Sequence, residues 1–181
     1  VHQSGYSEKA INRRSCAGTV QERLKRKSHM VTIIPFTADK IDLVIAFEKQ
    51  LRAEEPNTYY WEPDATYVQK LHDSFCDTRF QTAISLLAMR GGKVVGRIEA
   101  SLITSRCDAC CCSAYLDWIC VLKSERHQHI GQIMLRELRS ALKKSGVEVL
   151  IALIAKNKES QRFYHSVENA SIHDEGIWIE V

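Results

Sequence analysis

The stretch that decides the fold is Val121-Leu-Lys-Ser-Glu-Arg-His-Gln-His-Ile-Gly-Gln132, which joins two segments of different hydrophobic periodicity. Before it, Ala114 to Leu122 is typical of a strand, and after it apolar residues recur every four positions from Ile130 to Leu142, as on a helix face. A strand that runs through a tight loop into a helix directs unpaired backbone N–H groups at one point, a geometry that binds phosphate. Arg126 adds a permanent charge suited to a pyrophosphate. By itself, the loop is equally compatible with an ordinary turn that carries a surface arginine.

Strand and helix patterns alternate along the rest of the chain. The expected elements are a strand at 31–36, a helix from residue 39 to before Pro56, a helix at 64–76, hairpin strands at 84–89 and 94–102, a strand at 114–122, a helix from 130 that stops at Gly146, a strand at 149–154, a helix at 158–166 and a terminal strand at 177–181. The hairpin turn is Gly91-Gly92. This order predicts a mixed α/β sheet with a central hairpin and excludes a doubly wound Rossmann order.

The length and composition predict one folded domain. The chain has 181 residues, 45% of them hydrophobic and 26% charged, with only 3 prolines. These values exclude a disordered, collagen-like or low-complexity chain. No apolar run approaches the roughly 18 residues that a membrane span needs. We therefore expect no membrane helix, and the start of the chain lacks the pattern of a secretory signal.

Basic charge is concentrated at the N-terminus. The chain has 25 Lys and Arg against 22 Asp and Glu, and residues 1–30 carry 7 and 2 of these, which leaves a slightly acidic body. We expect residues 1–29 to be a basic, flexible extension and residues 30–181 to be the domain. Vector-derived or processed sequence and an organellar transit peptide are alternatives for the extension. Because the body has no basic surplus, no nucleic-acid partner is expected.

The seven cysteines include three in succession, which favours a reducing, cytoplasmic location over a disulfide framework. The motif Cys107-x-x-Cys110-Cys111-Cys112 has the spacing of half a zinc site, but no second pair follows at finger spacing. We therefore expect reduced thiols and no metal, with zinc as the alternative. His127 and His129 are two positions apart, so they do not share a helix face for a metal.

Two motifs together resemble the GNAT N-acetyltransferase superfamily. The loop Arg126-x-x-His129-Ile-Gly131 is similar to the family's pyrophosphate loop, Arg/Gln-x-x-Gly-x-Gly/Ala, with His129 in place of the first glycine. Asn157-x-x-Ser160-x-x-Phe163-Tyr164 resembles the family's CoA-binding helix, Asn-x-x-Ala-x-x-Phe-Tyr. The resemblance covers about residues 30–181. It implies a mixed, mostly antiparallel central sheet with flanking helices, and acetyl-CoA as the cosubstrate.

The resemblance also implies residue roles. A backbone N–H at Val121, near a bulge in its strand, would hold the thioester carbonyl, and Tyr164 would protonate the departing CoA thiolate. Two core aromatics are the structural alternative for Phe163-Tyr164. The residues expected to bind acetyl-CoA are Val121, Arg126, His127, Gln128, His129, Ile130, Gly131, Gln132, Asn157 and Ser160.

Asp117 is the candidate for binding the acceptor amine and for relaying its proton. An acid in this strand resembles the Leu-Glu-x-x-Tyr-Val pattern of aminoglycoside 6'-type acetyltransferases. Strand alternation predicts that Tyr115, Asp117 and Ile119 share one face, so Tyr115 is a further acceptor contact. A purely structural Asp117 is the alternative, and it would need hydrogen bonds.

Residues 54–64 combine four acids and three aromatics without a Lys or Arg. Such a segment attracts a cation, which makes Glu54, Tyr59, Tyr60 and Trp61 candidate acceptor contacts. A helix cap at Asp64, with aromatics covering the sheet, is the structural alternative. Glu99 points either into the same cleft or into solvent.

The leading hypothesis is an acetyl-CoA-dependent N-acetyltransferase that acts on a primary amine by direct attack in a ternary complex. The acids favour a small cationic acceptor, aminoglycoside- or polyamine-like. A peptide or protein N-acetyltransferase is one alternative. A non-catalytic acyl-CoA-binding regulatory domain is another, because His129 replaces a glycine. We expect no membrane partner, and a homodimer remains open.

Overall fold

The computed structural model describes residues 30–104, 112–173, 176–177 and 179–180. The chain divides into two units, Val1–Met30 and Val31–Val181, and the fold below is that of the second. The expected extension at residues 1–29 lies outside the described residues, as do Cys107, Cys110 and Cys111 of the cysteine motif.

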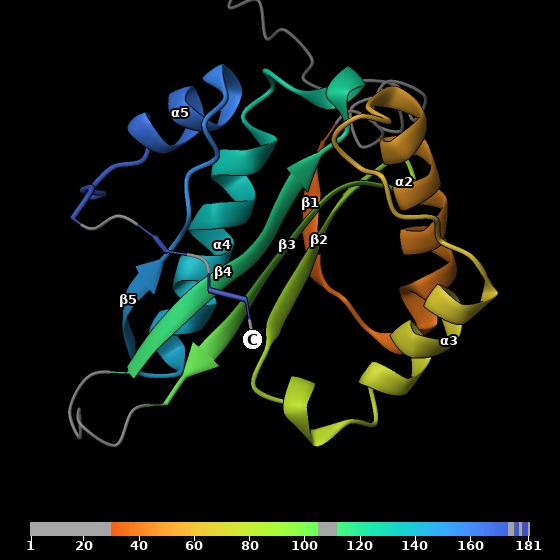
Figure 1. Cartoon of the computed structure of the whole chain (residues 1–181), viewed down its shortest axis with the longest axis horizontal. Coiled ribbons are helices and arrows are strands. Elements are labelled where there is room, and N and C mark those ends of the chain that lie inside the picture. Colours follow the sequence, from red (N-terminus) through yellow and green to blue (C-terminus); the bar gives the residue numbers. More distant parts are fainter. Residues whose placement is uncertain (1–29, 105–111, 174–175, 178, 181) are drawn as a thin grey trace, which may run out of the picture. The chain divides into compact units, whose positions relative to one another are not determined.

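A five-stranded sheet forms the centre of the fold, and its spatial order, β1-β2-β3-β4-β5, follows the chain (Figure 1). Neighbouring strands are antiparallel except β4 and β5, which are parallel. The strands are β1 Thr32–Pro35, β2 Ile84–Arg90, β3 Lys93–Ile103, β4 Cys112–Val121 and β5 Val147–Ile151. The expected mixed, mostly antiparallel sheet is confirmed.

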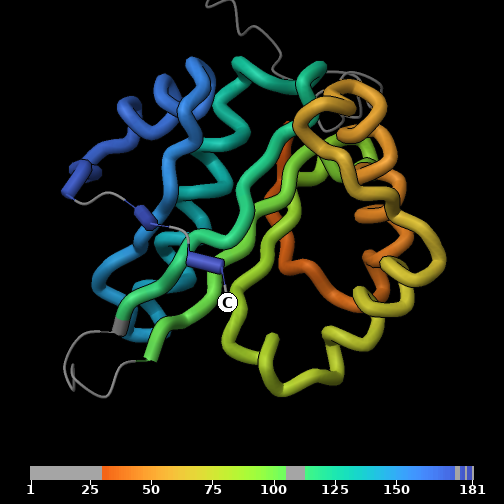
Figure 2. Tube along the Cα trace, viewed as in Figure 1, coloured from red at the N-terminus to blue at the C-terminus, as the bar shows by residue number. Residues whose placement is uncertain are grey.

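Helices cover both faces of this sheet (Figures 1 and 2). In the described part of the chain they are α2 Ile41–Glu54, α3 Ala65–Ser74, α4 Ile130–Lys144 and α5 Lys158–His165, with short 3-10 helices η1 Ala38–Lys40, η2 Thr78–Phe80 and η3 Lys123–Glu125. A Cβ atom added at Gly96 of β3 would lie 2.9 Å from Met134 of α4. The next residue, Arg97, pairs with Glu48 of α2 at 2.9 Å. Because neighbouring strand residues point to opposite faces, α4 and α2 lie on opposite sides of the sheet.

Local sequence signals predict these elements well. The four-residue repeat of α4 is buried at Ile130, Met134, Leu138 and Leu142. Asp64 caps α3 by accepting a hydrogen bond from the backbone N–H of Tyr67 at 2.8 Å, as expected for an N-cap. The hairpin turn has positive φ at both glycines, 56° at Gly91 and 78° at Gly92.

The β3–β4 ladder contains a bulge at Asp117. Glu99 pairs with Trp118, whereas the next residue, Ala100, pairs with Leu116. Asp117 is therefore an extra residue in β4 that has no partner in β3. Such an insertion bends the strand and reverses the alternation of side chains beyond it.

The bulge corrects two predictions about β4. Tyr115 and Ile119 do not share a face, because Ile119 pairs with Ile98 on the α4 side while Tyr115 pairs with Ser101 on the α2 side. The bulge itself lies at Asp117 and not beside Val121. Sequence alternation could not show this, because an unpaired residue is defined only by the register against the neighbouring strand.

β5 pairs along its whole length, but only with the first residues of β4. The parallel pairing runs from Cys112 with Val147 to Tyr115 with Ile151, and β5 ends there. β4 continues from Leu116 to Val121, and among the described residues no strand lies along its outer edge. Figure 1 shows the chain after β5 turning away from β4 towards α5. The sheet thus opens, and this open edge of β4, residues 116–121, exposes backbone hydrogen-bonding groups.

The expected terminal strand is wrong for the residues that the structure describes in it. Residues 177, 179 and 180 belong to no strand, and Ile177 and Ile179 are 83% and 75% exposed. An apolar alternation predicts a strand only where a neighbour supplies hydrogen bonds. β5 ends before the expected residue 154 for the same reason. Residues 152–154 have no neighbouring strand where β4 diverges, so they leave the sheet.

Candidate active site

The loop before α4 keeps the conformation of a glycine-rich loop without the glycines. His127 and His129 have positive φ angles of 62° and 61°. This left-handed conformation costs a non-glycine residue about 1–2 kcal/mol. His129 is the N-cap of α4, and its side chain makes no capping hydrogen bond. The first N–H groups of α4 therefore receive no hydrogen bond from the His129 side chain, and such a helix N-terminus can bind an anion.

Arg90 at the end of β2 anchors this loop. Its guanidinium pairs with Glu125 and donates a hydrogen bond to the side-chain oxygen of Gln128 at 2.7 Å. Gln128 was expected to bind acetyl-CoA, and in the structure its side chain holds the loop.

Packing between α4 and α5 brings the two sequence motifs together. A Cβ atom at Gly131 would lie 2.9 Å from Cε2 of Phe163, so only glycine fits at this position without a shift. The first turn of α4 therefore lies directly against α5. Asn157 caps α5, its side-chain oxygen accepting a hydrogen bond from the backbone N–H of Ser160 at 2.8 Å. This bond leaves the NH2 group of Asn157 as the part that can donate to a ligand.

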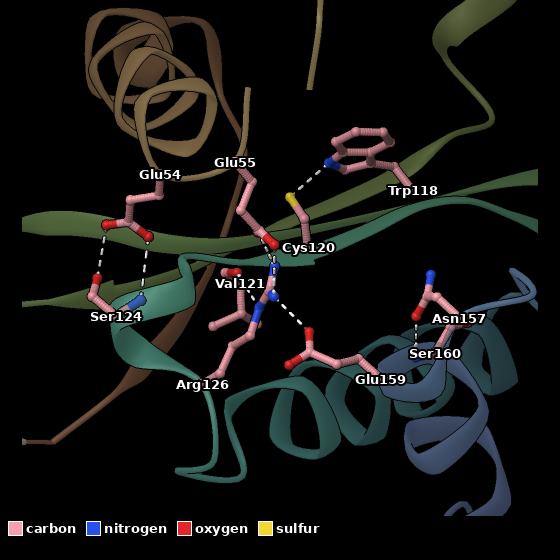
Figure 3. A network of polar contacts seen from close by, with 10 residues as sticks. All are labelled: Glu54, Glu55, Trp118, Cys120, Val121, Ser124, Arg126, Asn157, Glu159 and Ser160. Atoms are coloured by element: carbon pink, nitrogen blue, oxygen red, sulfur yellow. Dashed lines mark hydrogen bonds and ion pairs between the residues drawn. The ribbon is translucent and has the colours of Figure 1, made fainter. Parts of the chain in front are cut away.

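The Arg126 side chain lies across the end of the open edge of β4 (Figure 3). Its Nε donates a hydrogen bond to the carbonyl oxygen of Val121 at 3.2 Å. The guanidinium makes a two-point ion pair with Glu55, at the C-cap of α2, and a second pair with Glu159 of α5 at 2.5 Å. The sequence identified Arg126 but not its pairing with either carboxylate, because these lie 71 and 33 positions away along the chain.

Glu54 holds the turn that precedes this loop. Its carboxylate accepts hydrogen bonds from the backbone N–H of Ser124 at 3.2 Å and from the Ser124 hydroxyl at 2.9 Å. Burial raises the pKa of Glu54, but the hydrogen bonds from Gln50 and Ser124 outweigh burial and leave the pKa below its ordinary value. Glu54 thus caps η3, and we propose this positioning role in place of acceptor binding.

Asp117 lies at the bulge, on the α2 side of the sheet. Its carboxylate accepts a hydrogen bond from the Ser101 hydroxyl at 2.7 Å. Burial raises the pKa of Asp117; the Ser101 hydrogen bond partly opposes this, and the negative charge of Glu99 raises it further. A raised pKa makes Asp117 a stronger base than an ordinary carboxylate.

Glu99 belongs to a largely buried row of charges behind Asp117. Arg97 pairs with Glu99 at 3.0 Å and with Glu48 at 2.9 Å, and the Glu48 side chain is only 3% exposed. Arg97 also lies over the ring of Phe36, 5.1 Å from its centre. Glu99 therefore faces the same side as Asp117 and is not directed into open solvent.

The aromatic residues of the 54–64 segment cover Trp118 on this face. The ring centres of Trp61 and Trp118 are 5.2 Å apart, and Tyr59 lies 5.5 Å from Trp61, all edge to face. Tyr59 is buried and its hydroxyl lies against Arg126, whereas Tyr60 is 83% exposed. Tyr59 therefore covers the sheet, as the structural alternative expected. Tyr60 and the exposed part of Trp61 remain accessible to a ligand.

Tyr164 lies near the point where β4 and β5 separate. Burial raises the pKa of its hydroxyl, and Tyr115, the last paired residue of β4, adds to the shift electrostatically. The ring of Tyr164 packs against Phe163 at 5.1 Å. A tyrosine with a raised pKa keeps its proton at neutral pH, as a proton donor must.

Comparison with known proteins identifies the family. The sequence profile of the acetyltransferase (GNAT) family matches residues 46–167. The chain belongs to this family. It is therefore an N-acetyltransferase of the GNAT type, and the family takes its acetyl group from acetyl-CoA. The match begins within α2, extends through α5 and includes both motifs.

Solved structures agree with this fold at low sequence identity. An aminoglycoside acetyltransferase from an uncultured soil metagenomic sample, in complex with sisomicin, has a TM-score of 0.69 and 14% identity, covering 83% of this chain and 96% of its own. Ribosomal-protein-alanine N-acetyltransferase from Brucella melitensis biovar Abortus 2308 has a TM-score of 0.65 and 14% identity, covering 84% and 99%. A predicted acetyltransferase with acetyl-CoA from Clostridium acetobutylicum has a TM-score of 0.60 and 15% identity, covering 84% and 96%. No curated protein sequence matches the chain.

The described part of this GNAT chain contains no cluster of three or more His, Cys, Asp or Glu that could hold a metal. Cys120 is buried and accepts a hydrogen bond from the Trp118 indole N–H at 2.8 Å. Burial raises the pKa of this thiol to about 12, so it stays neutral. None of the described helices is long and apolar enough to cross a membrane.

Proposed function

We propose that this GNAT enzyme transfers the acetyl group of acetyl-CoA to a primary amine of a small cationic acceptor, by direct attack in a ternary complex. The open edge of β4 is the observation that carries the proposal. This edge contains the Asp117 bulge at one end and leads to the starts of α4 and α5 at the other, so it can hold an extended pantetheine chain between a phosphate site and an acid.

Three groups of acetyl-CoA have suitable partners along this edge: the pantetheine amides, the pyrophosphate and the thioester carbonyl. Unpaired backbone groups of β4 suit the pantetheine amides, with the NH2 group of Asn157 opposite them. The first N–H groups of α4, which follow His129, suit the pyrophosphate. The thioester donor was expected beside a bulge in this strand, and the bulge lies at Asp117, within the open edge. We therefore place the backbone donor beside Asp117 and not at Val121.

Asp117 and Tyr164 would then move the protons. The amine must be neutral to attack, so Asp117 takes a proton from the acceptor ammonium, directly or through water. Attack forms the new N–C bond and breaks the C–S bond. The product nitrogen releases its second proton to water, and Tyr164 gives its own proton to the leaving thiolate. Water also takes up the proton held by Asp117. Solvent then restores the proton of Tyr164. The carboxylates of Asp117 and Glu99 attract a cationic acceptor to this face.

Thiol release from acetyl-CoA with a panel of amines tests the proposal. The panel contains a polyamine, an aminoglycoside, a peptide with an N-terminal alanine and a neutral amine. We expect turnover to be fastest with a polyamine or aminoglycoside, and Asp117→Asn to remove most of it. Asp42→Asn, an equal change of charge on the exposed side of α2, is the matched control and should keep full activity.

The other outcomes separate the alternatives. Fastest turnover with the peptide would indicate a peptide or protein acceptor. Binding of acetyl-CoA without turnover of any amine would indicate a regulatory domain. An equal effect of Asp42→Asn and Asp117→Asn would remove Asp117 from the site.

A further inference from the structure

We propose that Glu55 positions Arg126 and that Glu159 is a built-in anion which the pyrophosphate of acetyl-CoA displaces when it binds. This inference rests on the proposed function, because it concerns how the same cosubstrate enters. It assigns opposite roles to two carboxylates that contact one guanidinium (Figure 3).

The two carboxylates hold Arg126 very differently. Glu55 binds with both oxygens, and its side chain is 17% exposed. Glu159 binds with one oxygen, and its side chain is 52% exposed. Two-point pairs shielded from water are strong, whereas single pairs with a solvent-exposed partner contribute little. Glu159 is therefore the partner that an incoming anion can replace.

Further contacts keep Arg126 in place when Glu159 leaves. Nε remains hydrogen-bonded to the carbonyl of Val121, and the buried Tyr59 hydroxyl lies against the guanidinium. Displacement of Glu159 therefore frees one side of the Arg126 guanidinium, while the other contacts keep the guanidinium in position. The incoming phosphate meets a preorganised cation, which reduces the conformational entropy lost on binding.

The ion pair between Glu159 and Arg126 lies where the proposed cosubstrate enters the sheet. Glu159 lies in the first turn of α5, between Asn157 and Ser160, while Arg126 lies at the end of the open edge of β4. The ion pair thus joins the two walls of the opening in the sheet. Two hollows, of about 470 and 200 Å³, lie elsewhere, and Arg126 lines neither of them.

Electrostatics supports an exchange of anions. One guanidinium with two carboxylates carries a net negative charge, which repels a pyrophosphate. The first turn of α4 contains no acidic residue, and Glu125 of the preceding loop is already paired with Arg90. Removal of the Glu159 charge should therefore favour acetyl-CoA, whereas loss of the Glu55 charge should release Arg126 from its binding position.

Calorimetric titration of acetyl-CoA into four single variants and one double variant tests the exchange. We expect Glu159→Gln to lower the Kd about 2- to 5-fold, the amount that one exposed ion pair contributes. Glu55→Gln should raise the Kd about 10-fold, because a buried two-point pair is lost. Arg126→Ala should also raise it. Glu137→Gln, an equal charge change on the exposed face of α4, should have little effect.

The double variant Arg126→Ala/Glu159→Gln shows whether Glu159 acts through Arg126. We expect Glu159→Gln to bring no gain in the Arg126→Ala background. A gain of the same size there, or no gain in the wild-type background, would overturn the exchange. Thermal unfolding shows whether the Glu55→Gln variant is folded. If that variant is unfolded, the Glu159→Gln result decides the proposal. Wild-type protein that binds no acetyl-CoA would instead refute the proposed function.

Discussion

Gly131→Ala tests whether the two sequence motifs depend on each other through packing. The added Cβ would lie 2.9 Å from Cε2 of Phe163. Carbon atoms in contact are about 3.5 Å apart or more, so the ring or α5 must move by about 0.6 Å. A movement of α5 carries Asn157 and Glu159 with it, although neither is substituted.

Two opposing terms set the size of the effect. Overpacking of this kind costs about 1–3 kcal/mol. Alanine in place of glycine within a helix returns about 0.5–1 kcal/mol. We expect a net loss of about 1 kcal/mol in the free energy of unfolding, which lowers the melting temperature of a domain of this size by about 2–4 °C. The Kd for acetyl-CoA should also rise, because the movement of α5 displaces Asn157.

Thermal unfolding by circular dichroism and calorimetric titration with acetyl-CoA measure the two effects. Phe163→Leu is the matched control, because leucine lacks the ring atom that the new Cβ would meet. In the Phe163→Leu background, Gly131→Ala should be neutral or stabilising. An equal loss of stability in both backgrounds would refute the packing argument, since the penalty would then come from the loop backbone.

Three further predictions concern proton transfer and the buried charges. Tyr164→Phe should lower kcat about 100-fold, near the lower limit for a general acid, with the KM for acetyl-CoA unchanged in steady-state assays. Since burial raises the pKa of Asp117, the stability that this group contributes is present below its ordinary pKa of 3.8 and is lost as the pH rises through the raised value. Asp117→Asn should therefore unfold at a higher temperature than wild type at pH 7 but not below pH 3.8, while its turnover falls. Arg97→Met should cost about 3–5 kcal/mol in urea unfolding, because it leaves Glu48 charged and buried, and adding Glu48→Leu should restore most of the loss.

The prediction of Arg126 illustrates the limit of motif analysis. Its spacing from Gly131 identified a cation at the start of a helix, and the structure places it there. Its ion pairs with Glu55 and Glu159 join three elements, and no linear pattern relates these residues. Glu54 illustrates the opposite case, because an acid next to aromatic residues suggested ligand binding, yet the side chain caps a neighbouring turn.

The sequence by itself determined the parts of this protein that depend on neighbours along the chain. The apolar repeat of α4, the cap at Asp64 and the glycine turn of the hairpin involve contacts only a few residues apart. Their free energies are set locally, so composition and spacing suffice to predict them. The tertiary structure alone decided the bulge at Asp117, the opening of the sheet after Tyr115 and the partners of Arg126. Each of these depends on strand register or on packing between distant elements, which one strand or loop cannot determine.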